Sequence, residues 1–298
     1  MIRRAAPWLG LRTALLLALS VLGIGVRAND SDWPLACRLS CYGKYQDEAW
    51  THLPALGVHY VYMQVPAPDA VGPLQKKLQE HGLKALVLGG RCDLSRADFL
   101  KEMAPQLQAC KSLGVHHLFL SPKHDKIERD EVYARLRRLG ELAKRFDVTL
   151  VLETHPDLGT NGAVQVETMK AVHHPNVRVN FDTGNITFYN HDTDAAAELA
   201  RSIDYVATVE LKDHGGGYKA WDFPALGQGK TNFEGVFRLL KKHGFHGPMT
   251  IEVEGVSGRT LDREQTKQVI ADSVAYLRNL ARSLDAAGTD SQHARTPR

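Results

Sequence analysis

Short β-rich runs alternate with amphipathic segments along most of the chain, and this alternation constrains the fold more than any other feature. It favours parallel strands, because each helical segment returns the chain to the same edge of the sheet. Eight strand–helix units in about 250 residues match a (β/α)8 TIM barrel, which we expect over residues 37–282. A doubly wound sheet is the alternative, but it usually has about five or six strands, and no Gly-x-Gly-x-x-Gly follows the first run. The eight runs are CRLSCY, YVYMQV, KALVLGG, HHLFLS, VTLVLET, VRVNFD, YVATVEL and MTIEVEG.

The first 28 residues have the pattern of a secretory signal. Arg3, Arg4 and Arg12 precede an apolar run of 13 residues, and the small residue Ala28 ends the segment. A basic start, a short apolar stretch and a small exit residue are typical of a cleaved signal peptide. A retained anchor is the alternative, but the run is short beside the about 20 residues of a membrane-spanning helix. We therefore expect an exported protein, periplasmic or extracellular, that meets the membrane only through this segment before cleavage.

Two flanking segments complete the expected organisation. Residues 29–36 form an N-terminal linker, and residues 283–298 are polar without an apolar period, which is typical of a disordered tail. The signal holds four arginines and no acids, so the formal net charge of +3 becomes −1 after cleavage. Because no basic stripe with interleaved aromatic residues remains, we expect no nucleic-acid partner.

Four cysteines leave the redox state open: Cys37, Cys41, Cys92 and Cys110. Export permits disulfides, and buried free thiols are the alternative. On one extended strand Cys37 and Cys41 would lie about 13 Å apart, too far for a disulfide. No Cys-x-x-Cys pair is present, so a zinc knuckle is not expected.

Polar side chains gather where the fifth to eighth predicted strands end. In a parallel barrel the carboxyl ends of the strands form one face, and the chemistry takes place there. Residues two apart on a strand share a face, so we expect these side chains to converge on one active site. They are Glu153 and His155 after the fifth run, Asp182 and Asn185 after the sixth, Glu210, Lys212, Asp213 and His214 after the seventh, and Glu252 and Glu254 after the eighth.

Four of these acids would repel one another if they all pointed inward: Glu153, Asp182, Glu210 and Glu252. A divalent cation would relieve the repulsion, and oxygen ligands suit Mg²⁺ or Mn²⁺. A salt bridge to Lys212 is the other remedy. A bound metal would polarise a carbonyl or a hydroxyl pair and stabilise an enediolate, and a carboxylate on each side of the substrate could move a proton to or from carbon.

Each acid also has a structural alternative. A single acid at a strand end is more often a helix cap or a salt-bridge partner, and Asp213 could simply hold the following loop. The joint placement of four acids on successive strands favours a functional site over these separate explanations.

The xylose isomerase-like TIM barrel proteins, the sugar phosphate isomerase/epimerase group, resemble this chain in the runs LVLETH, VRVNFDTGN, LKDH, WDFPALGQG and GPMTIEVEG. The likeness covers about residues 37–282 and is strongest from 148 to 255. It implies metal ligands at Glu153, Asp182 and Glu252, with a fourth ligand on the seventh strand. It also implies that Glu153 and Glu252 form an acid–base pair.

The resemblance further places His155 and Lys212 in the substrate pocket, and it shows two departures from the family pattern. The fourth ligand is usually a histidine followed by x-Lys-Asp, whereas this chain has Glu210, and Asn185 stands where a histidine is also common. Glu210 could bind a hard divalent ion. Alternatively, it could pair with Lys212 or another cation and leave a three-ligand or metal-free site.

The loop after the seventh strand, HGGGYKAWDFPALGQG, is long and glycine-rich. We expect Trp221 to stack on the apolar face of a sugar and His214 to contact the same substrate, while the closed loop excludes water. A packed loop that caps the barrel is the alternative.

Two classes of function follow. The first is an exported isomerase or epimerase that moves a proton on a sugar or keto-sugar by enediolate chemistry, with paired glutamates and a Mn²⁺ or Mg²⁺ cofactor; a lyase is a close variant. The second is a non-catalytic carbohydrate-binding TIM barrel with a degraded metal site. Both take a small-molecule sugar. A metal bound at Glu210 favours the enzyme, and an ion pair of Glu210 with Lys212 favours the binding protein.

Overall fold

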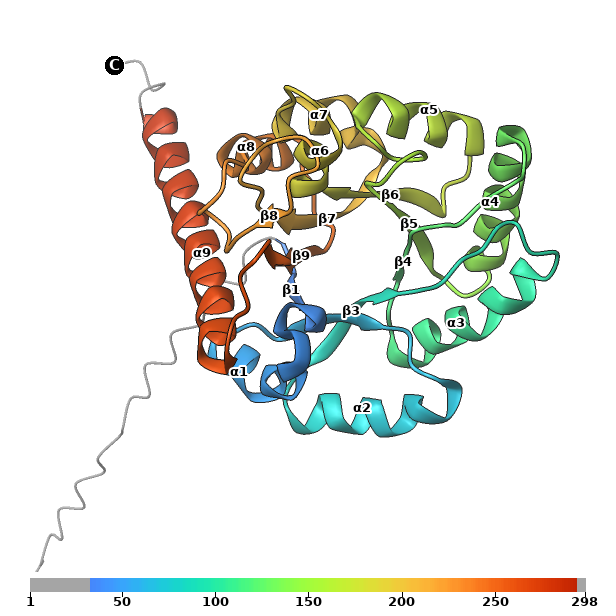
Figure 1. Ribbon diagram of the computed structural model, residues 1–298, viewed down its shortest axis with the longest axis horizontal. Helices are drawn as coiled ribbons and strands as arrows, with labels where there is room; N and C mark the ends of the chain where they lie inside the picture. The colour runs from blue at the N-terminus through green and yellow to red at the C-terminus, as the bar shows by residue number, and fades with distance from the viewer. Residues whose placement is uncertain (1–32, 294–298) are drawn as a thin grey trace, which may run out of the picture. The chain divides into compact units, whose positions relative to one another are not determined.

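The computed structural model describes residues 33–293, so the predicted signal segment and residues 294–298 lie outside it. Eight parallel strands close into a barrel in the order β1-β2-β3-β4-β5-β6-β7-β9, surrounded by helices (Figure 1). The expected (β/α)8 barrel is confirmed. The strands of the barrel are β1 Leu35–Arg38, β2 Tyr60–Gln64, β3 Lys84–Gly89, β4 His117–Leu120, β5 Thr149–Glu153, β6 Val177–Asp182, β7 Val206–Lys212 and β9 Met249–Glu252.

The helices begin and end where local sequence signals place them. Asn161, Asp194 and Asn232 each cap a helix by accepting a backbone N–H, and Gly114 and Gly244 end two helices in the left-handed conformation. The α-helices are α1 Ala49–Ala55, α2 Val71–Glu80, α3 Phe99–Leu113, α4 Arg129–Lys144, α5 Gly162–Val172, α6 Thr183–Tyr189, α7 Ala195–Ser202, α8 Phe233–His243 and α9 Arg263–His293; the 3-10 helices are η1 Leu39–Glu48, η2 Pro68–Ala70 and η3 Ile203–Tyr205.

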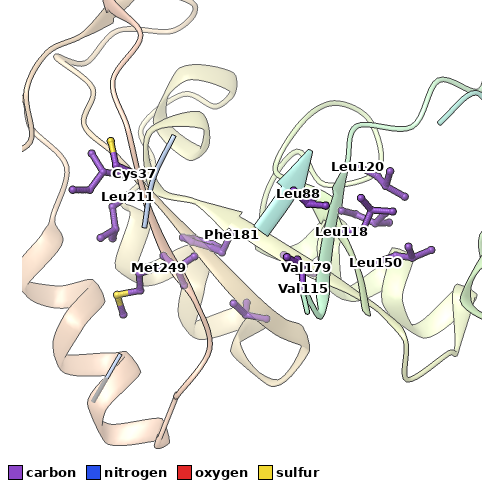
Figure 2. Packing of buried hydrophobic residues seen from close by; sticks show 14 of the residues in the cluster. Cys37, Leu88, Val115, Leu118, Leu120, Leu150, Val179, Phe181, Leu211 and Met249 are labelled. Atoms are coloured by element: carbon purple, nitrogen blue, oxygen red, sulfur yellow. The ribbon is translucent and has the colours of Figure 1, made fainter. Parts of the chain in front are cut away.

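Alternation along each strand divides its residues between two layers. Val179 and Phe181 of β6 belong to the large apolar cluster that the strands form with the helices (Figure 2). Because successive side chains point to opposite faces, Asn180 and Asp182 point into the barrel. The same alternation on β7 packs Val209 and Leu211 outward and turns Thr208, Glu210 and Lys212 inward.

The interior of the barrel has an apolar side and a polar side. On the polar side, buried groups satisfy one another, as buried polar atoms must: the Thr208 hydroxyl donates to Asn180 Oδ1 at 2.7 Å. The sequence thus concentrates its inward-facing polar residues on β6, β7 and β9. The apolar side is a separate cluster from β2 to β5, made of Tyr62, Val87, Phe119 and Val151.

The first strand is shorter than the run CRLSCY predicts. It ends at Arg38, and the chain continues as a 3-10 helix from Leu39. Cys41 is therefore not on an extended strand, and its expected separation from Cys37 is wrong: a hydrogen bond between the two thiols, together with burial, raises the pKa of Cys37. All four cysteines are free thiols.

Several predicted boundaries also differ from those of the structure. The expected linker, 29–36, overlaps β1, which begins at Leu35. The short helix α6 was not expected. The segment from residue 283 was expected to be disordered, but α9 continues to His293. Within residues 33–293, no helix combines the length and the apolar character needed to cross a bilayer.

Candidate active site

The strand register brings the predicted acids together. Asp182 lies opposite Glu210 where β6 pairs with β7, and Lys212 lies opposite Glu252 where β7 pairs with β9. Neighbouring strands are about 4.8 Å apart, so partners on the inner face can touch. All four residues are buried, with at most 5% of their surface exposed.

Three of the four predicted metal ligands form one cluster. One ligand oxygen each from Asp182, Glu210 and Glu252 lies within 4.8 Å of the other two, so this buried group is close enough to hold a metal ion. Glu153 is not part of the group. It is half-buried at the end of β5, and its side chain makes no ion pair or hydrogen bond with another residue of 33–293.

The site contains a cation that the sequence patterns did not point to, Arg38 at the end of β1. Its Nε and Nη2 donate to the two oxygens of Glu210, with Nη2 at 2.8 Å, and its Nη1 lies 2.6 Å from Oε1 of Glu252. The guanidinium carbon is 4.1 Å from the ring centroid of Tyr62 and 4.8 Å from that of Phe119. Burial alone would lower the pKa of Arg38, but the charges of Glu210 and Glu252 raise it.

Lys212 provides the second cation of the cluster. Its Nζ lies 2.7 Å from Glu252, 2.9 Å from Glu254 and 3.0 Å from Oδ2 of Asp182, and it donates to Asn185 Oδ1 at 3.1 Å. An ammonium has three N–H donors for these four acceptors. Well-aligned hydrogen bonds go to Asn185 and Glu254, and Oδ2 of Asp182 is a buried oxygen without one. The carboxylates raise the pKa of Lys212 although burial opposes this.

The three clustered carboxylates differ in the direction of their pKa shifts. Burial raises the pKa of Asp182 to about 6, against the attraction of Lys212. Burial also raises the pKa of Glu210 above its ordinary value, although Arg38 opposes this. For Glu252 burial acts in the same direction, but Arg38 and Lys212 outweigh it, so its pKa is lowered. Glu252 is therefore the most firmly ionised of the three.

Ion pairing and metal binding compete for the same oxygens. Arg38 binds both oxygens of Glu210, and Arg38 and Lys212 each bind one oxygen of Glu252. Oδ1 of Asp182 accepts two backbone N–H groups of α6. Two like charges 4 Å apart repel by about 4 kcal/mol at an effective dielectric constant of 20, and a divalent ion doubles this. The cluster fits a metal in donor type and spacing, but not in charge while both cations are in place.

Asn185 and His155 have different environments from those expected. Asn185 is buried on α6, where its amide donates to the carbonyl of Thr154 at 3.0 Å and its oxygen faces Lys212. β5 ends at Glu153, so its alternation does not extend to His155. His155 is exposed, and its ring stands edge-on to Tyr189 with centroids 4.9 Å apart.

His214 positions the loop after β7 and does not line the cavity. It is 1% exposed. One ring nitrogen bonds to the hydroxyl of Thr187 at 2.8 Å and the other donates to the carbonyl of Ala220 at 2.9 Å. Both ring nitrogens are therefore occupied, and the expected substrate contact of His214 is replaced by a structural role.

Asp213 anchors the same loop, as its structural alternative proposed. Its Oδ2 accepts the backbone N–H groups of Gly227 and Gly229, both at 2.8 Å, and its Oδ1 accepts those of His214 and Thr231. A Cβ at Gly229 would lie 2.4 Å from Oδ1 of Asp213, so this close approach requires glycine. Four hydrogen bonds to one carboxylate fix both ends of the loop.

A cavity of about 690 Å³ opens beside the cluster. Arg38, Glu252, Glu254 and Trp221 are among the residues that line it. Trp221 is 48% exposed, so its ring is available for stacking as the sequence predicted. The strands β8, Asp222–Phe223, and β10, Gly255–Val256, pair antiparallel and join this loop to the one after β9.

The barrel fold has counterparts in known proteins. A family model described as xylose isomerase-like TIM barrel matches residues 54–280. The chain belongs to this family. The resemblance seen in the sequence is thereby confirmed, and the family's matched span includes every predicted site residue.

Individual relatives are more distant. L-ribulose-5-phosphate 3-epimerase UlaE of Salmonella paratyphi C (strain RKS4594) is 28% identical over 175 residues, which are 56% of this chain and 60% of the epimerase. The match thus spans less than two thirds of that relative.

Solved structures share the fold over more of the chain. An L-ribulose 3-epimerase superposes with a TM-score of 0.72 at 15% identity, covering 89% of this chain and 100% of that one. A xylose isomerase-like TIM barrel protein from Mycobacterium smegmatis, in complex with magnesium, gives 0.66 at 16% identity, with coverages of 84% and 97%. At these identities the structures establish the common fold alone.

Proposed function

We propose that this chain is an isomerase or epimerase that moves a proton on a sugar or keto-sugar. The observation that carries the proposal is the placement of Glu153 and Glu252 at the ends of two strands, β5 and β9, with β6 and β7 between them. A substrate bound between these strand ends would lie between two carboxylates. The epimerases among the relatives of this family support the same reaction class.

The two carboxylates differ in the partners they have before a substrate binds. Glu153 has no partner within residues 33–293, so its oxygens are open to a substrate proton. Glu252 starts ionised, because Arg38 and Lys212 bind its oxygens. Removal of a proton next to a carbonyl leaves an enediolate with negative charge on oxygen. The two fixed cations would stabilise that charge as preorganised donors.

The proposed reaction does not require the predicted Mn²⁺ or Mg²⁺ cofactor. An oxygen-only donor set suits such an ion, and the magnesium complex of a structural neighbour shows that the fold can accept one. In this chain, however, Arg38 and Lys212 already pair with the three clustered carboxylates. We also propose that the protein is exported, on the basis of the signal pattern in residues 1–28.

Solvent deuterium exchange tests the proposal. A panel of aldoses and ketoses is incubated with residues 29–298 in D₂O, and incorporation next to the carbonyl is followed by NMR. We expect exchange with at least one sugar, and a loss of about 10² to 10⁴ in rate for Glu153→Gln and for Glu252→Gln. Glu167→Gln, an exposed acid of α5, is the matched control and should retain the activity.

A carbohydrate-binding protein without catalysis is the second candidate. The ion pair of Glu210 with Arg38 favours it, because the position of the family's fourth ligand is occupied by a salt bridge. A sugar that binds, as measured by calorimetry, but exchanges no deuterium would support this second function and contradict the first.

A further inference from the structure

We propose that Arg38, together with Lys212, takes the place of a divalent metal ion in this barrel, so that the site works without metal. The inference rests on the site described above and concerns the positive charge that faces the substrate. It follows from the ion pairs between these cations and the clustered carboxylates, not from the reaction assigned to the site.

The guanidinium of Arg38 lies where it joins two carboxylates of the cluster. Three of its five N–H donors are directed at Glu210 and Glu252. Beneath it, the rings of Tyr62 and Phe119 lie 4.1 and 4.8 Å from the guanidinium carbon, a cation–π geometry. A half-buried guanidinium held by two carboxylates and two rings is a fixed part of the site, unlike a surface arginine that samples several positions.

Glu210 is built as a partner for Arg38. The planar fork of arginine matches a carboxylate in two parallel hydrogen bonds, which is the pairing observed. Oε2 of Glu210 also accepts from Asn180 Nδ2 at 3.2 Å, and Thr208 in turn donates to Asn180 Oδ1. Nitrogen donors therefore use three of the about four lone-pair sites of this carboxylate, which leaves little for a metal. Glu210, which stands in place of the family's usual histidine, is thus already paired with a cation, Arg38.

Lys212 provides the second positive charge of the cluster. It pairs with Asp182 and Glu252, so every carboxylate of the three-membered cluster has a cationic partner. A divalent ion placed among these oxygens would stand next to a guanidinium and an ammonium, and both would repel it. It could bind only if one of these cations left.

The consequence for substrate is a specific mode of binding. Arg38 lines the cavity and keeps two N–H donors that no carboxylate of the cluster uses. Such donors suit the oxygens of a carbonyl or of a hydroxyl pair, and their charge favours the anionic form of those oxygens. The electrophile is then a hydrogen-bonding cation that stays protonated at any working pH.

Mn²⁺ binding tests the inference without reference to activity. The protein, purified without chelators and without a metal-affinity column, is analysed for bound metals by mass spectrometry and titrated with Mn²⁺ by electron paramagnetic resonance. We expect no stoichiometric metal and no saturable site at millimolar Mn²⁺. Arg38→Met removes the guanidinium, and Arg38→Met with Glu210→His also restores the family's ligand type. We expect both variants to bind Mn²⁺ at least about tenfold more tightly than the wild type.

A second arginine variant serves as the control for Mn²⁺ binding. Arg259→Met removes another arginine of the same cavity wall and should leave Mn²⁺ binding unchanged. Near-stoichiometric metal in the wild type, or Arg38 variants that fold by circular dichroism yet gain no affinity, would overturn the inference. If the variants do not fold, the wild-type titration alone decides.

The outcomes for the metal and for the proposed function can be told apart. If no sugar exchanges deuterium, the proposed function fails but the result on metal binding still stands. If EDTA abolishes the exchange, only the metal-free site is contradicted.

Discussion

At the scale of single residues, Arg38 determines how the clustered acids behave. Without it, Glu210 would be a fully buried carboxylate whose pKa burial already raises, and Glu252 would lose one of the two cations that lower its pKa. One guanidinium therefore stabilises two ionised groups. A buried charge that loses its partner is strongly destabilising, whereas replacing a whole pair by apolar groups costs much less.

This contrast gives a stability prediction. Arg38→Met should lower the free energy of unfolding by about 3–5 kcal/mol, because Glu210 is left buried and unpaired. Adding Glu210→Met should recover a substantial part of the loss. Urea denaturation of the single and double variants measures both values, with Arg259→Met as a control near the wild type. A double variant no more stable than Arg38→Met would show that the pair does not act as a unit.

Asp182 gives a pH prediction with a definite sign. Its pKa is about 6 in the folded protein against an ordinary value of 3.8, so the folded state binds more protons between these two values. Stability from this group is therefore full below about pH 4 and is lost as the pH rises through 6, by about 3 kcal/mol in all. The unfolding free energy of the wild type relative to Asp182→Asn, measured from pH 4 to 8, should fall with pH. A difference that rises with pH would contradict the assignment.

The sequence predicted most of this cluster, including Lys212, but not Arg38. Asp182, Glu210 and Glu252 follow from the rule that polar residues at strand ends meet at one face. Arg38 obeys the same rule, since it ends the first strand, and a charge there after an apolar pair is the signal that could have found it. That it pairs with Glu210 could not be read from the sequence, because β1 and β7 come together only when β9 pairs with both and closes the barrel.

At the scale of elements, the loop between β7 and α8 depends on one aspartate. Asp213 accepts four backbone N–H groups, and β8 is paired with β10. The sequence showed a long glycine-rich loop and could not distinguish a mobile lid from a packed cap. The contacts favour a cap that is fastened at both ends while Trp221 stays exposed.

Removal of the anchor should loosen the loop. Asp213→Ala leaves the N–H groups of Gly227, Gly229 and Thr231 without an acceptor, whereas that of His214 still donates to Thr231 Oγ1. Each buried unsatisfied group costs about 1–3 kcal/mol. We expect residues 215–231 to exchange amide hydrogens faster in mass spectrometry, while the strands of the barrel stay protected. Asp125→Ala, at an exposed aspartate, should leave exchange in this loop unchanged. Equal protection in Asp213→Ala would mean that other contacts hold the loop.

Elements with strong periodicity were predictable, and those set by tertiary contacts were not. Alternating runs located the eight barrel strands, and helical spacing located the helices between them. The run CRLSCY was expected to be strand throughout, but its second half is 3-10 helix, because the chain turns over the mouth of the barrel immediately after Arg38. Short apolar runs do not show where a strand ends.

At the scale of the whole molecule, export remains a prediction, because the signal pattern lies in residues 1–28, outside the described residues 33–293. A bacterial host that expresses the full chain with a C-terminal tag should release a product whose N-terminus lies near Asn29, since cleavage is expected after Ala28. Intact-mass analysis of the periplasmic and cytoplasmic fractions checks this. Replacing Leu15, Leu16 and Leu17 by glutamate should keep the full-length product in the cytoplasm. A wild-type product that stays full-length and cytoplasmic would refute export.

The ring of strands closes where β1 meets β9, and this has a consequence for how the protein becomes active. Arg38 and Glu210 are 172 residues apart, and Glu252 comes from the last strand of the barrel. During synthesis, the arginine emerges long before any of its acidic partners and must remain hydrated until they arrive. Barrel closure and neutralisation of the buried charges are therefore the same event. A chain that stops before β9, or that folds only in part, cannot assemble the cluster of Arg38, Glu210 and Glu252.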